Sequence, residues 1–179
     1  MDHRLKTWIH ELRRFNGKLH LMGPAMLDNI EEEVEVMMPL LELIDEPVLA
    51  DLGSGSGLPV IPYKILHPDS YVFLIERSVK KCTFLQHVIG VLGLEEVEII
   101  SQDPMKVAIG PFDAVIARSF SPLTTLREAC LRIIKDNGKL YYLYTGITPE
   151  LQPFTLEDVR TQIRGKLSLN LAIFSRHPG

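Results

Sequence analysis

The residues best suited to chemistry lie in one short stretch, where an apolar run at 48–52 leads into closely spaced glycines. Glycines at the carboxyl end of a strand let a ligand approach the backbone, and the N-terminus of the following helix offers free N–H groups. We therefore expect these glycines to serve a ligand rather than packing. The residues expected to contact it are Asp51, Gly53, Ser54, Gly55, Gly57, Leu58 and Pro59.

The spacing of the glycines narrows the choice of ligand. A dinucleotide fingerprint, GxGxxG, requires glycine at position 58, where the chain has Leu58, and the phosphate loop GxxxxGK[ST] is absent as well. The pattern is instead an acid followed by x-GxGxG, which resembles the loop of S-adenosylmethionine (SAM) dependent methyltransferases. In those enzymes the acid, here Asp51, helps to hold the methionine end of the cofactor. A glycine turn without a ligand is the alternative.

Two further acids follow later apolar runs. Glu76 ends the run at 71–75, 25 residues after Asp51, and a carboxylate there can accept hydrogen bonds from both hydroxyls of a ribose. Asp103 follows the run at 97–100 and can accept from an adenine amino group. An exposed acid at a strand end and a plain loop aspartate are the respective alternatives.

Short apolar runs alternate with helical patterns from Pro47 onward, which is typical of βαβ units and a parallel sheet. A turn at Asn137 and Gly138 leads into the fifth strand, and a C-terminal antiparallel hairpin turns at residues 164–166. The fold class is therefore α/β, a Rossmann-like, mostly parallel sheet with helices on both faces. We expect strands at 48–52, 71–75, 97–100, 114–117, 140–143, 159–163 and 167–174, and helices at 58–66, 79–92 and 123–134.

The first 45 residues form a helical extension in this interpretation, and residues 46–179 form the main domain. An amphipathic helix is indicated by Leu5, Trp8 and Leu12 at helical spacing, and a second helical run covers 26–41. The acidic stripe at 31–35 is interpreted as a solvated face of that run.

Composition and charge limit the function classes. The chain has 179 residues, a net charge of −4 and two cysteines without CxxC spacing, so we expect buried thiols, no structural zinc or other metal, and no strong indiscriminate binding of nucleic acid. A signal peptide or membrane span is not evident, so we expect a cytoplasmic monomer that does not contact membranes.

From about residue 15 to 146 the chain resembles the GidB/RsmG family, bacterial methyltransferases that modify a guanine N7 in 16S rRNA. The most specific segment is 112–120, which ends in Arg118-Ser-Phe120. The other matching segments are 15–21, 51–59, 61–62, 74–76, 80–81, 84–85 and 143–146.

The resemblance implies SAM as cofactor and 16S rRNA or the small ribosomal subunit as partner. It places Arg118 in the cofactor and substrate pocket, as the one candidate catalytic residue, and it implies backbone and apolar contacts to adenine at Pro104 and Met105. The residues expected to face RNA phosphates are Arg4, Arg13, Arg14, Lys18, Arg77, Lys80 and Lys81.

The chain also departs from the family. The acidic stretch 31–35 replaces a basic, histidine-containing motif, and Thr145 replaces a lysine. Two alternatives therefore remain open at this point: a methyltransferase for a small molecule or a protein, and a SAM-binding module without catalysis.

Overall fold

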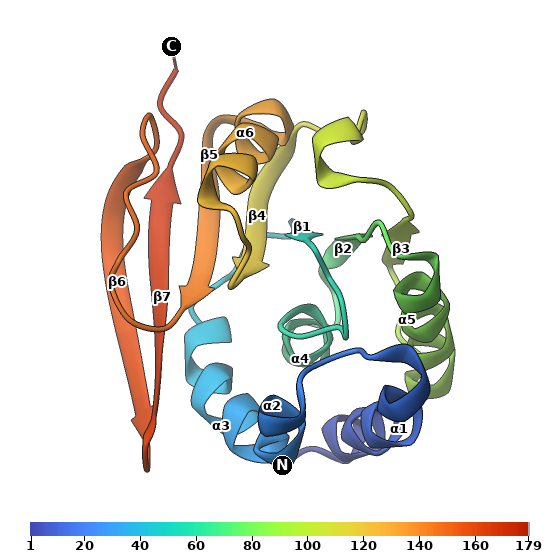
Figure 1. Cartoon of the computed structure of the whole chain (residues 1–179). Helices are drawn as coiled ribbons and strands as arrows, with labels where there is room; N and C mark the ends of the chain where they lie inside the picture. Colours follow the sequence, from blue (N-terminus) through green and yellow to red (C-terminus); the bar gives the residue numbers. More distant parts are fainter. Residues whose placement is uncertain (179) are drawn as a thin grey trace.

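A computed structural model describes residues 1–178, which form a seven-stranded sheet with helices on both faces (Figure 1). The strands are β1 (Val48–Leu52), β2 (Tyr71–Ile75), β3 (Val97–Ile100), β4 (Phe112–Arg118), β5 (Ile134–Tyr144), β6 (Thr155–Arg164) and β7 (Leu167–Ser175). The helices are α1 (His3–Leu19), α2 (Pro24–Asp28), α3 (Ile30–Leu41), α4 (Val60–Leu66), α5 (Val79–Leu92) and α6 (Leu123–Ile133), with a 3₁₀ turn η1 (Pro104–Lys106).

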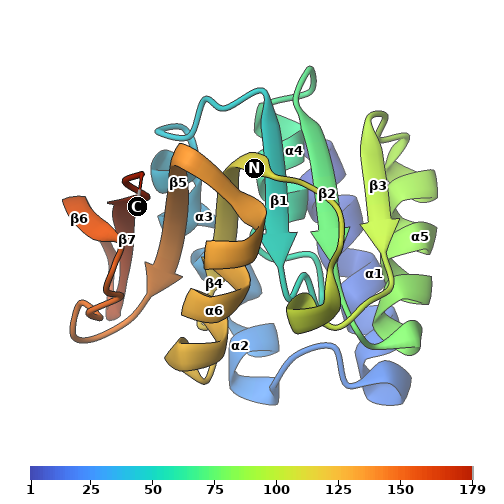
Figure 2. The ribbon, with the colours of Figure 1, turned by 90° about the horizontal axis from the view of Figure 1, so that it is seen from above.

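The strand order is β3-β2-β1-β4-β5-β7-β6, with β1 to β5 parallel and β7 antiparallel to both of its neighbours. From β1 the chain first builds outward to β3 and then returns to build the other half of the sheet from β4. The reversal occurs between β1 and β4, as Figure 2 shows from above. In open α/β sheets the crevice at such a point, beyond the carboxyl ends of the strands, is where ligands bind. The predicted fold class is confirmed.

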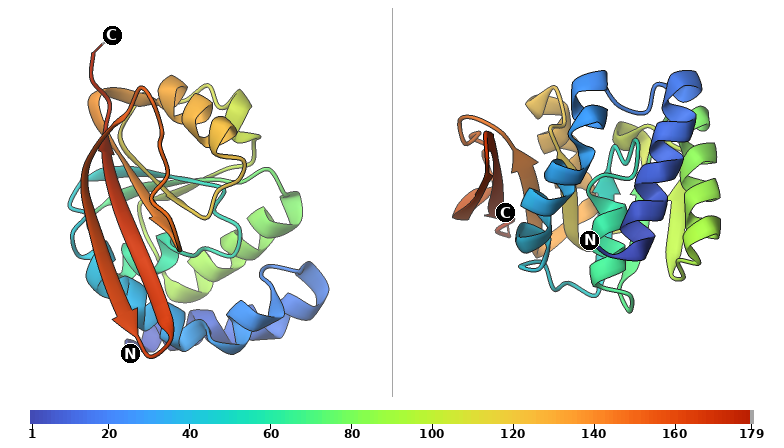
Figure 3. Two further views of the ribbon diagram at one scale, coloured as in Figure 1. Left: turned by 60° about the vertical axis from the view of Figure 1, so that its left-hand side comes forward. Right: turned by 90° about the horizontal axis from the view of Figure 1, so that it is seen from below.

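Two apolar clusters fill the space on either side of the sheet. Helices α1, α3, α4 and α5 cover one face, with Trp8, Met37, Tyr63 and Phe84 fully or almost fully buried (Figure 3, right). Helix α6 and η1 cover the other face. Side chains of residues 1–45 therefore share a core with β1 and β2, although the sequence pattern changes at residue 46.

Most predicted elements are present, with shifted ends. The strands at 48–52, 71–75 and 97–100 and the helix at 79–92 match, whereas β4 is longer than predicted at both ends. Helix α4 begins at Val60 rather than residue 58, because Gly57 has a left-handed φ of +90° and Pro59 occupies the cap position. The second helical run is broken into α2 and α3 at Asn29, whose side chain donates to the Ala25 carbonyl.

The predicted turn before the fifth strand is wrong. Helix α6 ends at Ile133 and β5 begins directly at Ile134, so Asn137 and Gly138 lie inside a strand with an irregular register against β4. Backbone bonds to the chain end hold this bulge, since Asn137 N–H donates to the Arg176 carbonyl at 2.8 Å and Arg176 N–H to the Gly138 carbonyl at 2.9 Å. Local turn propensity was therefore overridden by pairing with distant residues.

The C-terminal hairpin is confirmed and is longer than predicted, with β6 at the edge of the sheet (Figure 3, left). Its turn contains Gly165 at a φ of +57°. The hairpin packs against α3, so the N-terminal helices and the C-terminal strands contact each other directly.

Cys82 and Cys130 are both free and buried, as predicted. Over residues 1–178, none of the helices is both long and apolar enough to cross a bilayer. The same residues contain no group of three or more histidine, cysteine, aspartate or glutamate side chains arranged to hold a metal ion.

Gly138→Ala tests the bulge in β5. A Cβ at this position would lie 2.8 Å from the Asp113 carbonyl oxygen and 2.9 Å from that of Lys135, both backbone atoms, so we expect a loss of about 1–3 kcal/mol in unfolding free energy. The control is Gly90→Ala in α5, where a Cβ would meet nothing within 4 Å beyond its chain neighbours and the backbone of its own helix, and the substitution should be neutral or stabilising. Equal thermal unfolding curves for the two variants would contradict this account.

Candidate functional site

The glycine loop is tied to the end of β2 by backbone bonds. Gly53 and Ser54 donate their N–H groups to the Ile75 carbonyl at 2.8 and 3.2 Å, and Gly55 N–H donates to Glu76 Oε2 at 2.9 Å. Gly53 and Gly55 have left-handed φ values of +77° and +55°, which glycine adopts without strain. The loop therefore has a fixed shape at the carboxyl ends of β1 and β2.

The glycines of the loop have different tasks. A Cβ on Gly57 would lie 2.5 Å from Ile61 Cγ1, so this glycine is required by packing, and the expectation that none of them serves packing is wrong here. Gly53 lies against the ring of Phe120, which a Cβ would meet at 3.3 Å. Only Gly53 and Gly55 border open space beside the loop.

Glu76 lies where the sequence predicted, directly after β2, and is buried. Besides Gly55 N–H, its carboxylate accepts the Ser78 N–H at 2.7 Å through Oε1. Each oxygen of a carboxylate can accept a second bond, so Glu76 retains capacity for two further donors. The side chain also lines a hollow beside the loop.

Asp51 is the least conventional group of the site. Its side chain is 1% exposed, and neither carboxylate oxygen has a hydrogen-bond partner within residues 1–178. Burial and, to a smaller extent, the nearby charge of Glu76 raise the pKa of Asp51 to about 7, whereas Ser54 opposes the shift. A buried acid without partners is costly, and both oxygens of Asp51 remain available to a donor or a cation.

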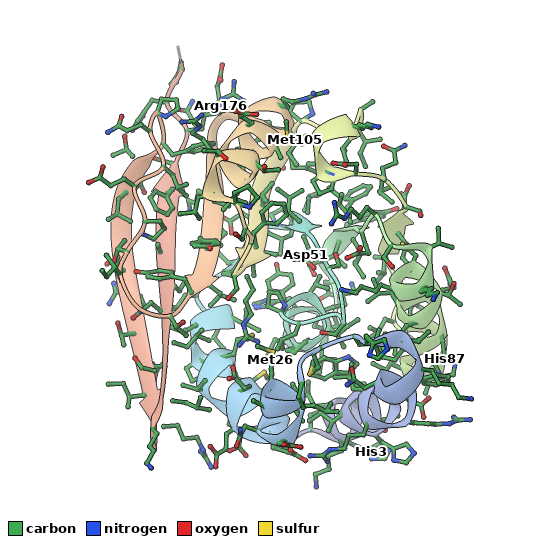
Figure 4. All side chains as sticks on the ribbon, in the orientation of Figure 1. His3, Met26, Asp51, His87, Met105 and Arg176 are labelled. Atoms are coloured by element: carbon green, nitrogen blue, oxygen red, sulfur yellow. The ribbon has the colours of Figure 1, made fainter. Side chains whose placement is uncertain are left out.

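Two hollows flank the loop, and Gly53 lines both of them. The Met105 hollow has a volume of about 540 Å³ and is lined by Gly53, Glu76, Arg77, Lys81, Asp103, Pro104, Met105, Phe120, Ser121, Pro122 and Thr125. The Met26 hollow has about 250 Å³ and is lined by Leu21, Met22, Gly23, Met26, Gly53, Ser54, Gly55, Ser56, Leu58, Arg118 and Ser119. In Figure 4, Met105 and Met26 lie on opposite sides of Asp51. The pair of hollows can hold an elongated ligand and a second molecule beside it.

The predicted contacts after β3 lie in the Met105 hollow. Asp103 caps η1, because its Oδ1 accepts the Met105 N–H at 2.9 Å, and this bond fixes the rim formed by Asp103, Pro104 and Met105. Pro59, in contrast, serves as the cap residue of α4. The structure thus brings together the loop, Glu76 and residues 103–105.

Arg118 is the last residue of β4 and reaches the Met26 hollow, at the strand end where it was predicted. Its Nη2 donates to Glu33 Oε2 of α3 in an ion pair, while Nε and Nη1 are buried without a partner in the described chain. Burial lowers the pKa of Arg118, and the charge of Glu33 opposes this shift. The prediction of a solvated acidic face is therefore wrong for Glu33, whereas Glu31 and Glu35 remain partly exposed in pairs with Arg13 and Arg164.

Sequence reasoning missed two supports of the loop. The indole of Trp8 in α1 is fully buried and donates to the Ser56 carbonyl at 3.1 Å, yet in the sequence Trp8 is one apolar residue on a helix face. Phe120 packs on Gly53 and lines the Met105 hollow. Its position directly after Arg118-Ser was the available signal.

Comparison with known proteins places this geometry in a family. A family model described as rRNA small subunit methyltransferase G matches residues 1–171. The chain is 33% identical over 168 residues to a ribosomal RNA small subunit methyltransferase G of Polynucleobacter asymbioticus, covering 86% of this chain and 74% of that protein. The protein of the same name from Roseiflexus sp. is 39% identical over 138 residues, which cover 73% of this chain but only 59% of the relative.

Solved structures support the fold. MtNAS in complex with S-adenosylmethionine superposes with a TM-score of 0.68 at 15% identity, over 96% of this chain and 73% of that one. M. jannaschii TYW2 in complex with AdoMet gives a TM-score of 0.58 at 21% identity, over 83% of this chain and 76% of the other. At these identities the likeness concerns the fold alone.

Asp51→Asn tests the state of the buried acid. Because the folded-state pKa of about 7 lies above the ordinary 3.8, the folded wild type binds more protons than the unfolded chain between these values, and its stability falls as pH rises from 4 to 7. Asparagine does not titrate, so the unfolding free energy of the variant should rise relative to that of the wild type between pH 4 and pH 7. The difference grows by ~1.4 kcal/mol per pH unit and reaches about 4 kcal/mol at most. Denaturant unfolding at several pH values measures it, with Asp136→Asn at an exposed position as the control. Parallel profiles of wild type and Asp51→Asn would contradict the assignment.

Proposed function

Because the chain belongs to the rRNA small subunit methyltransferase G family, we propose that it transfers a methyl group from SAM to N7 of a guanine in 16S rRNA of the small ribosomal subunit. The observation that carries the proposal is the loop itself. A family match over residues 1–171 coincides with a glycine loop set between a buried, unpartnered Asp51 and the carboxylate of Glu76. The substrate would make this a cytoplasmic enzyme.

The residues beside the loop fit SAM in chemical terms. When bound, SAM supplies a methyl group on a positively charged sulfur. In our proposal Asp51 attracts the ammonium group of the methionine part, and Glu76 accepts from the ribose hydroxyls with its spare lone pairs. Pro104 and Met105 offer an apolar wall for adenine in the Met105 hollow, with Asp103 at its rim.

The protein's contribution to the reaction is mainly orientation. Guanine N7 has a free lone pair and no proton, so the reaction needs no general base. Because Gly53 and Gly55 have no side chains, the methyl group on sulfur and guanine N7 can approach each other in line. Holding the two reactants in this orientation lowers the activation barrier of the transfer. Arg118, on the other side of the loop, is placed to hold the base.

We propose a narrower RNA-facing surface than the sequence suggested. The three N-terminal arginines are all engaged in ion pairs, Arg4 with Asp2, Arg13 with Glu31 and Arg14 with Glu11. In the described part of the chain, Lys18, Arg77, Lys80 and Lys81 form no ion pair, and of these Arg77 and Lys81 line the Met105 hollow. We propose that phosphates approach the site over Arg77, Lys80 and Lys81.

Gly55→Leu tests the loop as the cofactor site. A side chain at Gly55 would project beside the loop, and the affinity for S-adenosylhomocysteine, the demethylated product, should fall at least about tenfold. Gly93→Leu is the matched control, since Gly93 caps α5 at a similar φ of +60° with no described atom within 4 Å of a Cβ. Both variants should lose about 1–2 kcal/mol of stability from backbone strain. Calorimetric titration that finds equal affinities would refute the loop assignment.

The substrate is tested on ribosomal subunits. Small subunits from cells that lack the gene should accept one labelled methyl group from SAM with purified protein, and mass spectrometry of their 16S rRNA should find it as N7-methylguanosine. Large subunits from the same cells serve as the control. Methylation of a different atom, or no transfer to the small subunit, would disprove the proposed function.

A further inference from the structure

Helix α3 carries three carboxylates that each pair with an arginine from a different element. Glu31 pairs with Arg13 of α1 at 2.7 Å, Glu35 pairs with Arg164 of β6, and Glu33 pairs with Arg118 at the end of β4. All three are ion pairs between a glutamate of α3 and an arginine. Among the three pairs, only the Glu33 pair has a member, Arg118, that lines the Met26 hollow beside the glycine loop.

Burial separates this pair from the other two. The side chains of Arg118 and Glu33 are 8% and 14% exposed, against 47% and 44% for Arg13 and Glu31. Exposed ion pairs contribute little to the stability of the fold. A buried ion pair must first offset the large cost of removing both charges from water before it stabilises the fold. A buried pair at a ligand site is therefore better explained by what it does to the ligand than by stability.

The pair leaves Arg118 with an unusual set of donors. Glu33 accepts one N–H of Nη2, whereas Nε and Nη1 are buried without partners in residues 1–178. An unrestrained arginine binds guanine as a fork, donating to both O6 and N7. Such a fork would bind the N7 lone pair, which is the electron pair that must attack the methyl group.

We propose that Glu33 is a positioning residue for methyl transfer, which holds Arg118 so that it donates to O6 of the target guanine and leaves the N7 lone pair free. The inference rests on the proposed function. In the reaction the N7 lone pair forms the bond to carbon while the sulfur–methyl bond breaks and its electron pair remains on sulfur. No proton moves, and the positive charge passes from sulfur to the guanine.

This transfer of charge gives Glu33 a second effect. A guanine that becomes cationic is repelled by an uncompensated guanidinium, and the repulsion grows toward the transition state. Glu33 balances the charge of Arg118, so the pair as a whole is neutral. In a site with little water, the energy of the charge that develops on guanine depends strongly on nearby charged groups. The loss of Glu33 should therefore lower kcat more than it weakens cofactor binding.

Glu33→Gln tests the inference, with Glu31→Gln and Glu35→Gln on the same helix as matched controls. Glu33→Gln should lower kcat about tenfold or more on small subunits and leave the affinity for S-adenosylhomocysteine within about twofold, while both controls stay close to wild type. Glu33→Asp, which keeps the charge, should restore part of the rate. A loss of cofactor affinity that matches the loss of kcat, or equal losses in all three glutamine variants, would overturn the inference.

A double variant tests whether Glu33 acts through Arg118. In the Arg118→Met background, adding Glu33→Gln should cause no further loss of kcat, because the group being positioned is gone. A further loss as large as that of Glu33→Gln alone would contradict the inference.

One readout is independent of the substrate. The Nε–H resonance of Arg118, identified by its disappearance in Arg118→Lys, should shift in Glu33→Gln and remain in place in Glu31→Gln and Glu35→Gln. A wild type that methylates no subunit would contradict the proposed function. An unchanged resonance in Glu33→Gln would overturn the role of Glu33 whether or not the wild type is active.

Discussion

The hydrogen bond from Gly55 N–H to the Glu76 carboxylate, 2.9 Å long, connects the ends of the two strands that form the site. It forms only because β1 and β2 pair in parallel with Leu52 opposite Ile75, which brings their carboxyl ends level. The bond fixes the glycine loop against β2 and orients Glu76 into the Met105 hollow. Gly53, which lines both hollows, is held beside the same strand end by its own bond to the Ile75 carbonyl.

Around this connection the sheet and the helices contribute different parts. The sheet supplies the loop, Glu76 and Arg118, each at the carboxyl end of a strand. The N-terminal helices support them from one side, since Trp8 of α1 holds the Ser56 carbonyl and Glu33 of α3 holds Arg118. The helical segment before residue 46 is thus part of the site as well as of the core.

The features that could be predicted from the sequence are those that a short stretch of residues determines. Apolar runs located the strands, and the glycine spacing with Glu76 located one side of the site, because these features lie within short windows. The pairs that complete the site join distant residues, Trp8 with Ser56 and Glu33 with Arg118, which are 48 and 85 positions apart. A charge pattern on one helix cannot reveal a partner on a strand, so the acidic stripe looked solvated. The bulge in β5 was missed for the same reason, since Arg176 holds it.

We propose that the glycine loop, with Asp51 and Glu76 on either side, holds the adenosyl and methionine parts of the cofactor. A crystal structure with S-adenosylhomocysteine tests it most directly. We predict ribose hydroxyls on the Glu76 carboxylate, adenine against Met105 and the ammonium group within hydrogen-bond reach of Asp51. A product molecule bound away from the loop, or an Asp51 carboxylate still without any partner, would contradict the account.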